Sequence, residues 1–230
     1  MVAFAGSGHG GKAALLSLQD SFQSIEILSI DQEILNLARE NDEIHNSTNF
    51  EDISADLVIC AGFMQIVPKS ILESKTVINT HPSLLPKYRG LHALAWAIIN
   101  GESKIGFSVH LMNQNIDDGP ILHQWVVDNN GSGPEYFLNY FNRCVRNELG
   151  GIIKSYLKGN IKPKKQNKFN ASWVSKRTLE DCKINFSTSN KELKCFFQAL
   201  QPPYPQPFFY FKGEKYTVTK VDFISEVYSA

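Results

Sequence analysis

The strongest constraint on the fold is an alternation of short apolar runs with amphipathic stretches through the first half of the chain. Four apolar runs have the length of buried strands and lie at residues 2–5, 25–30, 57–61 and 76–79. Between them, amphipathic stretches predict helices at residues 12–21 and 32–40, and a shorter helix opened by Pro68. This order predicts an α/β fold with a mostly parallel sheet flanked by helices.

The second half of the chain predicts two more strands and then a change of character. The strands lie at residues 106–112 and 121–127, and the longest helical pattern covers residues 134–157. From about Gly159 a polar, basic connection leads to a helix at residues 190–200 and a hairpin that turns at Lys212-Gly213. We therefore expect one domain at residues 1–160 and a small C-terminal α+β subdomain at residues 161–230. The subdomain is too small to hold much of a core alone, so we expect it to pack on the first domain or on a second subunit.

Charge and cysteine usage exclude several function classes. The 23 basic side chains balance the 23 acidic ones, so no overall field draws the chain to nucleic acid or to an anionic membrane. The four cysteines have no C-x-x-C spacing, which favours reduced thiols. No apolar run approaches the ~20 residues of a membrane span, and no basic leader precedes the first strand. We expect a cytoplasmic protein that binds neither nucleic acid nor membrane.

The glycine-rich opening GSGHGGK matches two phosphate-binding patterns incompletely. Gly6, Gly8 and Gly11 fit a dinucleotide fingerprint, with Asp31 at the place of the acidic residue that holds a ribose. An NAD-dependent oxidoreductase is therefore one alternative. As a P-loop the motif lacks its hydroxyl side chain. A third possibility is that the helix start contacts the phosphate of another substrate, through Gly8, His9, Gly10 and Lys12.

Polar side chains capable of acyl-transfer chemistry follow the fourth predicted strand. Asn79 and His81 alternate with Thr80, so both side chains point the same way at the carboxyl end of the strand. An amide can stabilise an oxyanion, and an imidazole can carry a proton. Asp117 precedes Gly119-Pro120 in a turn and is the natural partner to orient the imidazole.

The segment INTHPSLLPKYRG, followed by IDDGPI, resembles the formyltransferase family that uses 10-formyltetrahydrofolate, over residues 56–127. The resemblance implies a Rossmann-like domain in which Asn79, His81 and Asp117 are catalytic. An amine would attack the formyl carbon directly through a tetrahedral intermediate, without a metal. It also implies that VICAGFMQIVP is the folate-binding strand and loop. Main-chain groups of five consecutive residues would hold the pterin: Phe63, Met64, Gln65, Ile66 and Val67. Tyr88 and Arg89, in the same motif, are expected to bind the amine substrate.

The tail from Trp173 onward resembles the sugar N-formyltransferases, which act on nucleotide-linked amino-dideoxy sugars destined for surface polysaccharides such as O-antigen. The expected substrate is a dTDP-sugar, dTDP-4-amino-4,6-dideoxyglucose. The folate strand looks more like that of glycinamide ribonucleotide formyltransferases, which remain an alternative. Methionyl-tRNA formyltransferases are a further alternative, although they are longer and have a basic C-terminal domain. We expect a homodimer. The aromatic hairpin would stack on a base, pack on the main domain or form the homodimer contact.

The other histidines have no ligand-like spacing, so ordinary core or surface roles are expected for them and no metal site is expected. They are His9, His45, His92, His110 and His123.

Overall fold

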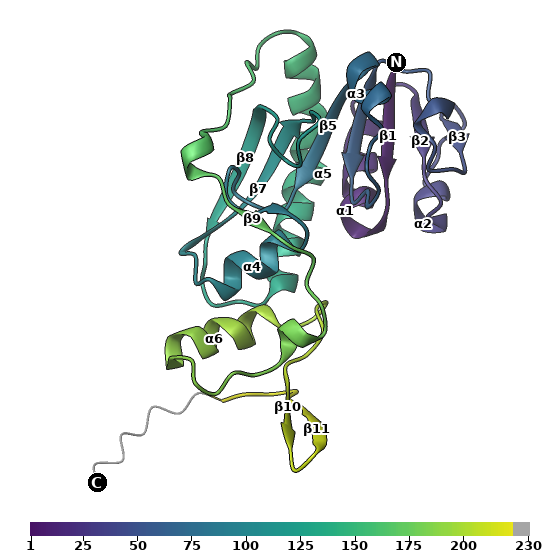
Figure 1. Ribbon diagram of the computed structural model, residues 1–230. Coiled ribbons are helices and arrows are strands. Elements are labelled where there is room, and N and C mark those ends of the chain that lie inside the picture. Colours follow the sequence, from purple (N-terminus) through teal and green to yellow (C-terminus); the bar gives the residue numbers. More distant parts are fainter. Residues whose placement is uncertain (223–230) are drawn as a thin grey trace.

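The computed structural model describes residues 1–222, which form an α/β fold around a seven-stranded sheet (Figure 1). Its strands are β1 (Val2–Gly6), β2 (Ile25–Leu28), β3 (Glu43–His45), β4 (Leu57–Ala61), β5 (Thr76–His81), β7 (Lys104–Leu111) and β8 (Ile121–Asp128). Their spatial order is β3-β2-β1-β4-β5-β7-β8; the first five strands pair in parallel, and β7 pairs antiparallel with both β5 and β8, so β7 alone runs in the opposite direction. The predicted mostly parallel sheet is confirmed.

Helices cover both faces of this sheet and create two separate cores. One face packs against α1 (Gly8–Gln19), α4 (Ala93–Ile99) and α5 (Pro134–Leu157). The other is covered by the 3-10 turn η1 (Phe50–Asp52) and by α3 (Lys69–Ser74). Because side chains alternate along a strand, neighbouring residues of β5 belong to different cores: Ile78 to the first and Val77 to the second.

Two glycines allow close backbone approaches, one between β1 and β4 and the other between α1 and α5. A Cβ on Gly6 would lie 2.1 Å from the carbonyl oxygen of Ala61, so β1 and β4 approach closely only because this side chain is absent. In α5, a Cβ on Gly150 would lie 2.4 Å from the carbonyl oxygen of Ser17 in α1. The amide N–H of Gly150 instead donates to the Ser17 hydroxyl at 3.0 Å. The helix pair therefore depends on a small residue at that position.

The helix expected at residues 32–40 is wrong in length, because α2 covers only Gln32–Leu35. Beyond it, the Arg39 guanidinium donates to the carbonyl oxygens of Gln19 and Phe22, and the Asp42 carboxylate accepts from the backbone of Arg39. These side-chain bonds satisfy backbone groups without a helix. The sequence analysis also missed the edge strand β3 and a two-residue parallel pair, β6 (Arg89–Gly90) with β9 (Trp173–Val174).

The C-terminal segment has two short 3-10 turns, η2 (Lys168–Asn170) and η3 (Glu180–Cys182), before α6 (Asn190–Ala199). A capping box formed by Ser189 and Glu192 begins α6, which packs against α4. The predicted hairpin is present as β10 (Phe208–Phe211) and β11 (Glu214–Thr217). Its Phe208 is buried against Cys182 and Leu200 rather than on the main sheet. The segment thus has a small core of its own and is attached to the rest through α6 and through the pairing of β9 with β6.

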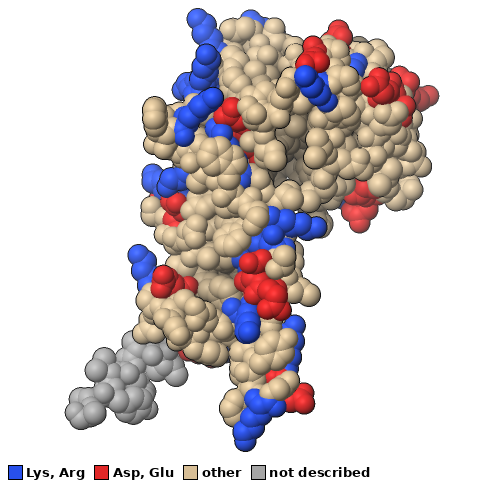
Figure 2. Space-filling view, viewed as in Figure 1, with Lys and Arg blue, Asp and Glu red and all other residues tan. Residues whose placement is uncertain are grey.

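Charged side chains of both signs are scattered over the face shown in Figure 2. Among residues 1–222, no helix is long and apolar enough to cross a bilayer.

Candidate active site

The predicted polar cluster lies where β5 ends beside the antiparallel strand β7. Asn79 and His81 project from the β5 face that also carries Val77, away from α1 and α5. In the register of the two strands, Asn79 lies opposite His110 of β7. The structure therefore adds a second histidine to the two residues expected at this strand end.

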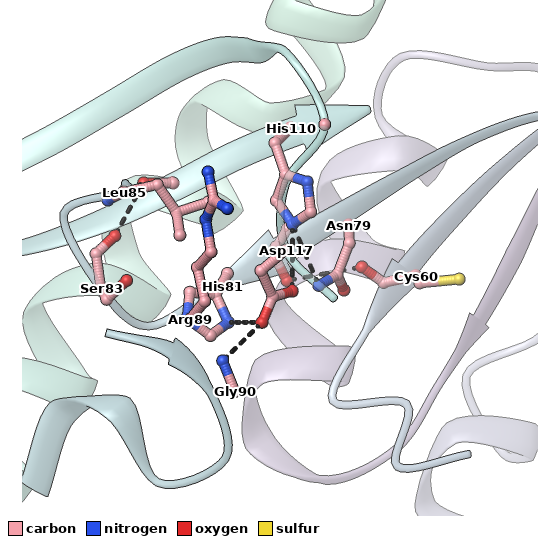
Figure 3. Close-up of polar contacts among 12 residues, drawn as sticks. Cys60, Asn79, His81, Ser83, Leu85, Arg89, Gly90, His110 and Asp117 are labelled. Atoms are coloured by element: carbon pink, nitrogen blue, oxygen red, sulfur yellow. Dashed lines mark hydrogen bonds and ion pairs between the residues drawn. The ribbon is translucent and has the colours of Figure 1, made fainter. Parts of the chain in front are cut away.

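Asp117 reaches this cluster from the turn after β7, as predicted (Figure 3). Its backbone has a φ of +50°, in the left-handed region that non-glycine residues seldom adopt. The N–H of Gly90 donates to its Oδ2 at 2.8 Å. The Gln166 side-chain amide donates to the carbonyl oxygens of Asp117 and Gly119, at 2.7 and 2.8 Å. Backbone and side chain are thus both fixed by residues from elsewhere in the chain.

The Asp117 carboxylate lies between two imidazoles. Its Oδ2 is 3.4 Å from Nδ1 of His81, and its Oδ1 is 3.5 Å from Nε2 of His110. The same Nε2 is 3.4 Å from the side-chain nitrogen of Asn79. His110 was expected to be an ordinary core or surface histidine. The sequence does contain a sign of this role: on the strand that pairs with β5, the polar Ser108 and His110 alternate with buried apolar residues.

His81 is almost completely buried, and both of its ring nitrogens face oxygen atoms. Nε2 lies 2.9 Å from the carbonyl oxygen of Tyr88, while Nδ1 faces Asp117. Burial lowers the pKa of His81 below its usual value, because it disfavours the charged ring, whereas the Asp117 charge and the Tyr88 carbonyl act in the opposite direction. The two acceptors therefore favour the protonated, charged ring, whereas the buried environment favours the neutral ring.

Asp117 is ionised at neutral pH despite its burial. Burial raises the pKa of a carboxyl group, but the hydrogen bond to His110, the charges of His81 and His110 and the Gly90 N–H outweigh it. Together they hold the pKa of Asp117 at about 2. The carboxylate can thus accept a hydrogen bond from an imidazolium, stabilise its charge and orient both rings.

Tyr88 and Arg89, which were expected to bind substrate, point into the protein. Arg89 is 2% exposed, and its guanidinium pairs with Asp118 at 2.7 Å and donates to the Gln166 oxygen. The Tyr88 hydroxyl donates to Glu102 at 2.8 Å, and burial raises its pKa to about 12. These contacts favour a positioning role for both side chains. Arg89 holds Asp118, the neighbour of Asp117, and also Gln166, whose amide binds the Asp117 carbonyl oxygen.

The loop predicted to hold folate follows β4, next to β5, and is open to solvent. Met64 and Ile66 are 69% and 92% exposed, whereas Val67 is buried and Phe63 packs edge-on against Phe50 at 5.0 Å. Gly62 starts this loop with a φ of +65°, where a Cβ would meet the Ser7 carbonyl oxygen at 2.3 Å. Exposed apolar side chains beside free main-chain groups suit a flat, partly polar ligand.

The glycine-rich opening forms the tight turn between β1 and α1. The N–H of Gly8 donates to Asp31 Oδ2 at 2.8 Å, and Asp31 Oδ1 accepts from the backbone of Glu33. Asp31 thus occupies the helix start where a phosphate would bind. Both of its carboxylate oxygens already accept backbone N–H groups, so they are not free to accept a hydrogen bond from a ribose hydroxyl. The arrangement disfavours NAD binding.

The remaining predicted substrate residues of α1 are not brought to the catalytic cluster. His9 and Lys12 line a groove between α1 and α5, next to Arg143. Gly10 adjoins the same groove, because a Cβ there would lie 3.8 Å from the Asn142 side chain. Helices α1 and α5 pack on the sheet face opposite to Asn79.

Chemically, the cluster has the groups that acyl transfer to an amine requires. The Asn79 amide adjoins the buried His110 imidazole, and the Asp117 carboxylate lies against both His110 and His81. The amide suits a developing oxyanion, and the imidazole and carboxylate suit a proton released by the attacking nitrogen.

Two family models match this chain. One, described as formyl transferase, matches residues 16–130, and the other, described as formyl transferase, C-terminal domain, matches residues 176–230. A methionyl-tRNA formyltransferase from Fusobacterium nucleatum is 30% identical over 176 residues, which cover 70% of this chain and 56% of that protein. The chain thus spans about half the length of such relatives. A GDP-perosamine N-formyltransferase from Brucella melitensis is 31% identical over 185 residues, covering 77% of this chain and 71% of that protein.

Solved structures share the whole fold at low sequence identity. A 4-N formyltransferase from Francisella tularensis superposes with a TM-score of 0.77 at 22% identity and covers 97% of this chain and 98% of its own. A sugar N-formyltransferase from a Shewanella species has a TM-score of 0.75 at 20% identity and covers 98% of both chains. These similarities extend through the C-terminal segment.

Proposed function

Because the chain belongs to the formyl transferase family, we propose that it transfers a formyl group from 10-formyltetrahydrofolate to the amine of a nucleotide-linked amino-dideoxy sugar. The observation that carries the proposal is the ionised Asp117 carboxylate between His81 and His110, beside the Asn79 amide. The three residues expected to be catalytic therefore lie together at one strand end and share one buried network.

Each residue of the network has a distinct part in the proposed transfer. As the amine nitrogen bonds to the formyl carbon, negative charge develops on the formyl oxygen, which the Asn79 amide stabilises. The amine proton passes to the Asp117–His81 pair and then to the departing folate nitrogen, whose bond to the formyl carbon breaks. The Gly90 N–H fixes Asp117 while the proton moves.

The loop after β4 is the proposed folate site. Folate, when bound, supplies the formyl group. Met64 and Ile66 offer exposed apolar surface to its ring system, and the main chain of residues 63–67 offers donors and acceptors to the pterin edge. Phe63 is anchored on Phe50 and would hold the loop at the required distance from the sheet.

Two observations favour a sugar nucleotide as the amine substrate. The GDP-perosamine N-formyltransferase matches over a larger share of its own length than the methionyl-tRNA enzyme does. The solved sugar N-formyltransferase also superposes more closely, with a TM-score of 0.75, than a solved methionyl-tRNA formyltransferase does at 0.65. The first substrate to test is dTDP-4-amino-4,6-dideoxyglucose, and GDP-linked amino sugars should be tested beside it. Methionyl-tRNA is the second candidate, since several similar proteins carry that name.

We further propose a division at residues 1–160 and 161–230, in which the second unit contributes to substrate recognition. Tyr210, Phe211 and Tyr216 of the hairpin are about half-exposed, which suits contact with a nucleotide base or with a second copy of the chain. The homodimer, the contribution to surface polysaccharides and the cytoplasmic location stay predictions.

The test is mass spectrometry of purified protein incubated with 10-formyltetrahydrofolate and a panel of amines. The panel contains dTDP- and GDP-linked 4-amino sugars, the 3-amino isomers, UDP-linked amino sugars, glycinamide ribonucleotide and methionyl-tRNA. Addition of a formyl mass to a sugar nucleotide, abolished by His81→Ala and retained by His123→Gln, supports the proposal. Formylation of methionyl-tRNA or glycinamide ribonucleotide alone overturns the substrate class but keeps the chemistry.

A further inference from the structure

Three potential metal ligands lie together on the edge strands β2 and β3, outside the proposed active site. Glu26 of β2 is paired in register with Glu43 of β3, and His45 lies two residues farther along β3. Because side chains at positions i and i+2 of a strand share a face, all three project to the same side of the sheet. One carboxylate oxygen from each glutamate and Nε2 of His45 lie within 4.8 Å of one another.

Glu26 is a buried and pre-oriented carboxylate. Its side chain is 1% exposed, and its two oxygens accept from the N–H and the hydroxyl of Ser54, both at 2.6 Å. Burial alone would raise the pKa of Glu26, but the hydrogen bonds from Ser54 and Ala55 and the proximity of His45 lower it, so the group stays ionised. Hydrogen bonds of this kind orient the carboxylate ligands of protein metal sites.

His45 carries the unexplained atom of this cluster. Its Nε2 is inaccessible to solvent and has no hydrogen-bond partner, although buried ring nitrogens normally have one. The nearest acidic oxygens belong to Glu26 and Glu43, each 3.7 Å away. That separation is too long for a hydrogen bond.

The same separation is close to that of two ligands on one ion. Donor atoms bound to a tetrahedral zinc ion at ~2.0–2.2 Å lie roughly 3.3–3.6 Å apart. A small contraction of the two His45–glutamate distances, together with closure of the Glu26–Glu43 oxygen pair, which lies within 4.8 Å, would give three bonds, one from each side chain. Glu43 is 64% exposed, so one side of the ion would remain open to a water ligand.

The chain segment that carries the cluster is mostly acidic, although Lys75 lies nearby and donates to the carbonyl oxygens of Ser54 and Ala55. From Asp20 to Asp56 the sequence holds ten acidic side chains and a single basic one, Arg39. Arg39 is engaged with Asp42 at 2.9 Å and does not compensate the cluster. In Figure 2, acidic side chains gather on the upper right, over the end of the molecule that carries β2 and β3 in Figure 1. Such a field concentrates cations near the surface.

We propose that Glu26, Glu43 and His45 form a site for one divalent cation of the zinc class, which fastens β3 to β2. One imidazole and two carboxylates suit borderline cations such as Zn²⁺. The strand β3 has three residues and an open edge, so a metal bridge would add to the few ladder bonds that hold it. The site takes no part in formyl transfer and does not depend on the proposed function.

The competing arrangement is a proton in place of the metal. A protonated His45 would attract both carboxylates without any ion, and the cluster would then be an ordinary ion-pair network. The two arrangements differ in their response to added metal. The ion-pair network gains no stability from it, whereas the stability of a metal site rises with the logarithm of the metal concentration once that concentration exceeds the Kd.

The experiment uses the full chain after treatment with a chelator that is then removed. Isothermal titration with Zn²⁺ at pH 7.5 measures stoichiometry and affinity, and a thermal melt with and without Zn²⁺ measures the change in Tm. Co²⁺ serves as a spectroscopic probe, because bound Co²⁺ absorbs visible light in a manner that depends on its ligands. Variants are Glu43→Gln and His45→Gln, and matched controls are Glu51→Gln and His123→Gln.

We expect one Zn²⁺ per chain, a Tm that rises with Zn²⁺ and a visible Co²⁺ spectrum. Glu43→Gln should weaken Zn²⁺ binding at least ~10-fold. Loss of a residue that only orients a metal ligand typically costs ~10–100-fold in metal affinity, and loss of the ligand itself should cost no less. Glu43 is largely exposed, so this variant should fold, as its circular dichroism will confirm. No saturable binding, or binding that both ligand variants retain like the controls, overturns the proposal.

Discussion

Nδ1 of His81 lies 3.4 Å from the Asp117 carboxylate, while the opposite ring nitrogen faces the Tyr88 carbonyl at 2.9 Å. Burial disfavours a positive charge on this ring, whereas the two acceptors favour it. Small changes in either acceptor should shift the proton affinity of the ring, which is the property that proton transfer depends on.

Asp117→Asn should lower the pKa of His81 further. The Asp117 charge opposes the effect of burial in the native protein, so its removal leaves burial dominant. NMR titration of the histidine ring resonances, assigned with His81→Gln, measures the change. An unchanged or higher pKa in Asp117→Asn would show that the carboxylate does not act on this ring.

Asn79→Ala and His81→Ala should each lower turnover by at least ~10²-fold, from the loss of an oxyanion donor and of a proton carrier. Steady-state kinetics with the sugar nucleotide identified by mass spectrometry measures the effect. His123→Gln removes an imidazole from β8, outside the cluster, and should retain native turnover. A near-native rate for either alanine variant removes that residue from the mechanism.

The native protein should lose stability as pH falls from about 4 toward 2. The folded-state pKa of Asp117 is held at about 2, below its usual value of 3.8, so its contribution is complete above the usual value and disappears below the depressed one. This difference corresponds to roughly 2 kcal/mol of unfolding free energy. Urea unfolding between pH 5 and pH 3 should therefore show a smaller decrease for Asp117→Asn than for the native chain.

Two adjacent glycines of α5 should respond oppositely to substitution by alanine. A Cβ on Gly150 meets the Ser17 backbone at 2.4 Å, so Gly150→Ala should lower the unfolding free energy by ~1–3 kcal/mol through overpacking. A Cβ on Gly151 meets nothing within 4 Å, so Gly151→Ala should raise it by up to ~1 kcal/mol through helix propensity. Urea unfolding of both variants measures their free energies of unfolding. Equal effects would mean that α1 and α5 do not pack this closely.

Arg89→Met should destabilise the chain by ~3–5 kcal/mol, because it leaves the buried Asp118 carboxylate without its partner. The double variant Arg89→Met/Asp118→Leu removes both charges and should recover part of the loss. Thermal and urea unfolding compare the two. A double variant less stable than Arg89→Met would contradict the assignment of Arg89 as the partner that compensates Asp118.

Elements that depend on local periodicity were predictable from the sequence. The strand at residues 57–61 agrees with β4, because a continuous apolar run indicates a strand buried on both faces. The helix at residues 134–157 agrees with α5, because apolar residues at helical spacing indicate one buried stripe. Asn79 and His81 were predictable as a pair, since strand alternation alone places them on one face.

Contacts across the fold were not predictable in the same way. Asp31 was read as a possible ribose ligand, yet it caps the Gly8 N–H from a neighbouring strand end. His110 had no local signal comparable to the strand-end motif, and its place beside Asn79 follows from the register of β5 and β7. The helix at residues 32–40 ends early because Arg39 binds carbonyl groups of a preceding segment.

The sequence by itself determined the α/β class and the order of most elements, and it pointed to the residues that we propose for formyl transfer. Only the tertiary structure decided that Asp117 lies between two histidines and that Glu26 meets Glu43 and His45. The physical reason is that periodicity is set by neighbours along the chain. Distant contacts instead depend on strand register and on the path of the loops, which are fixed only when the whole core is buried.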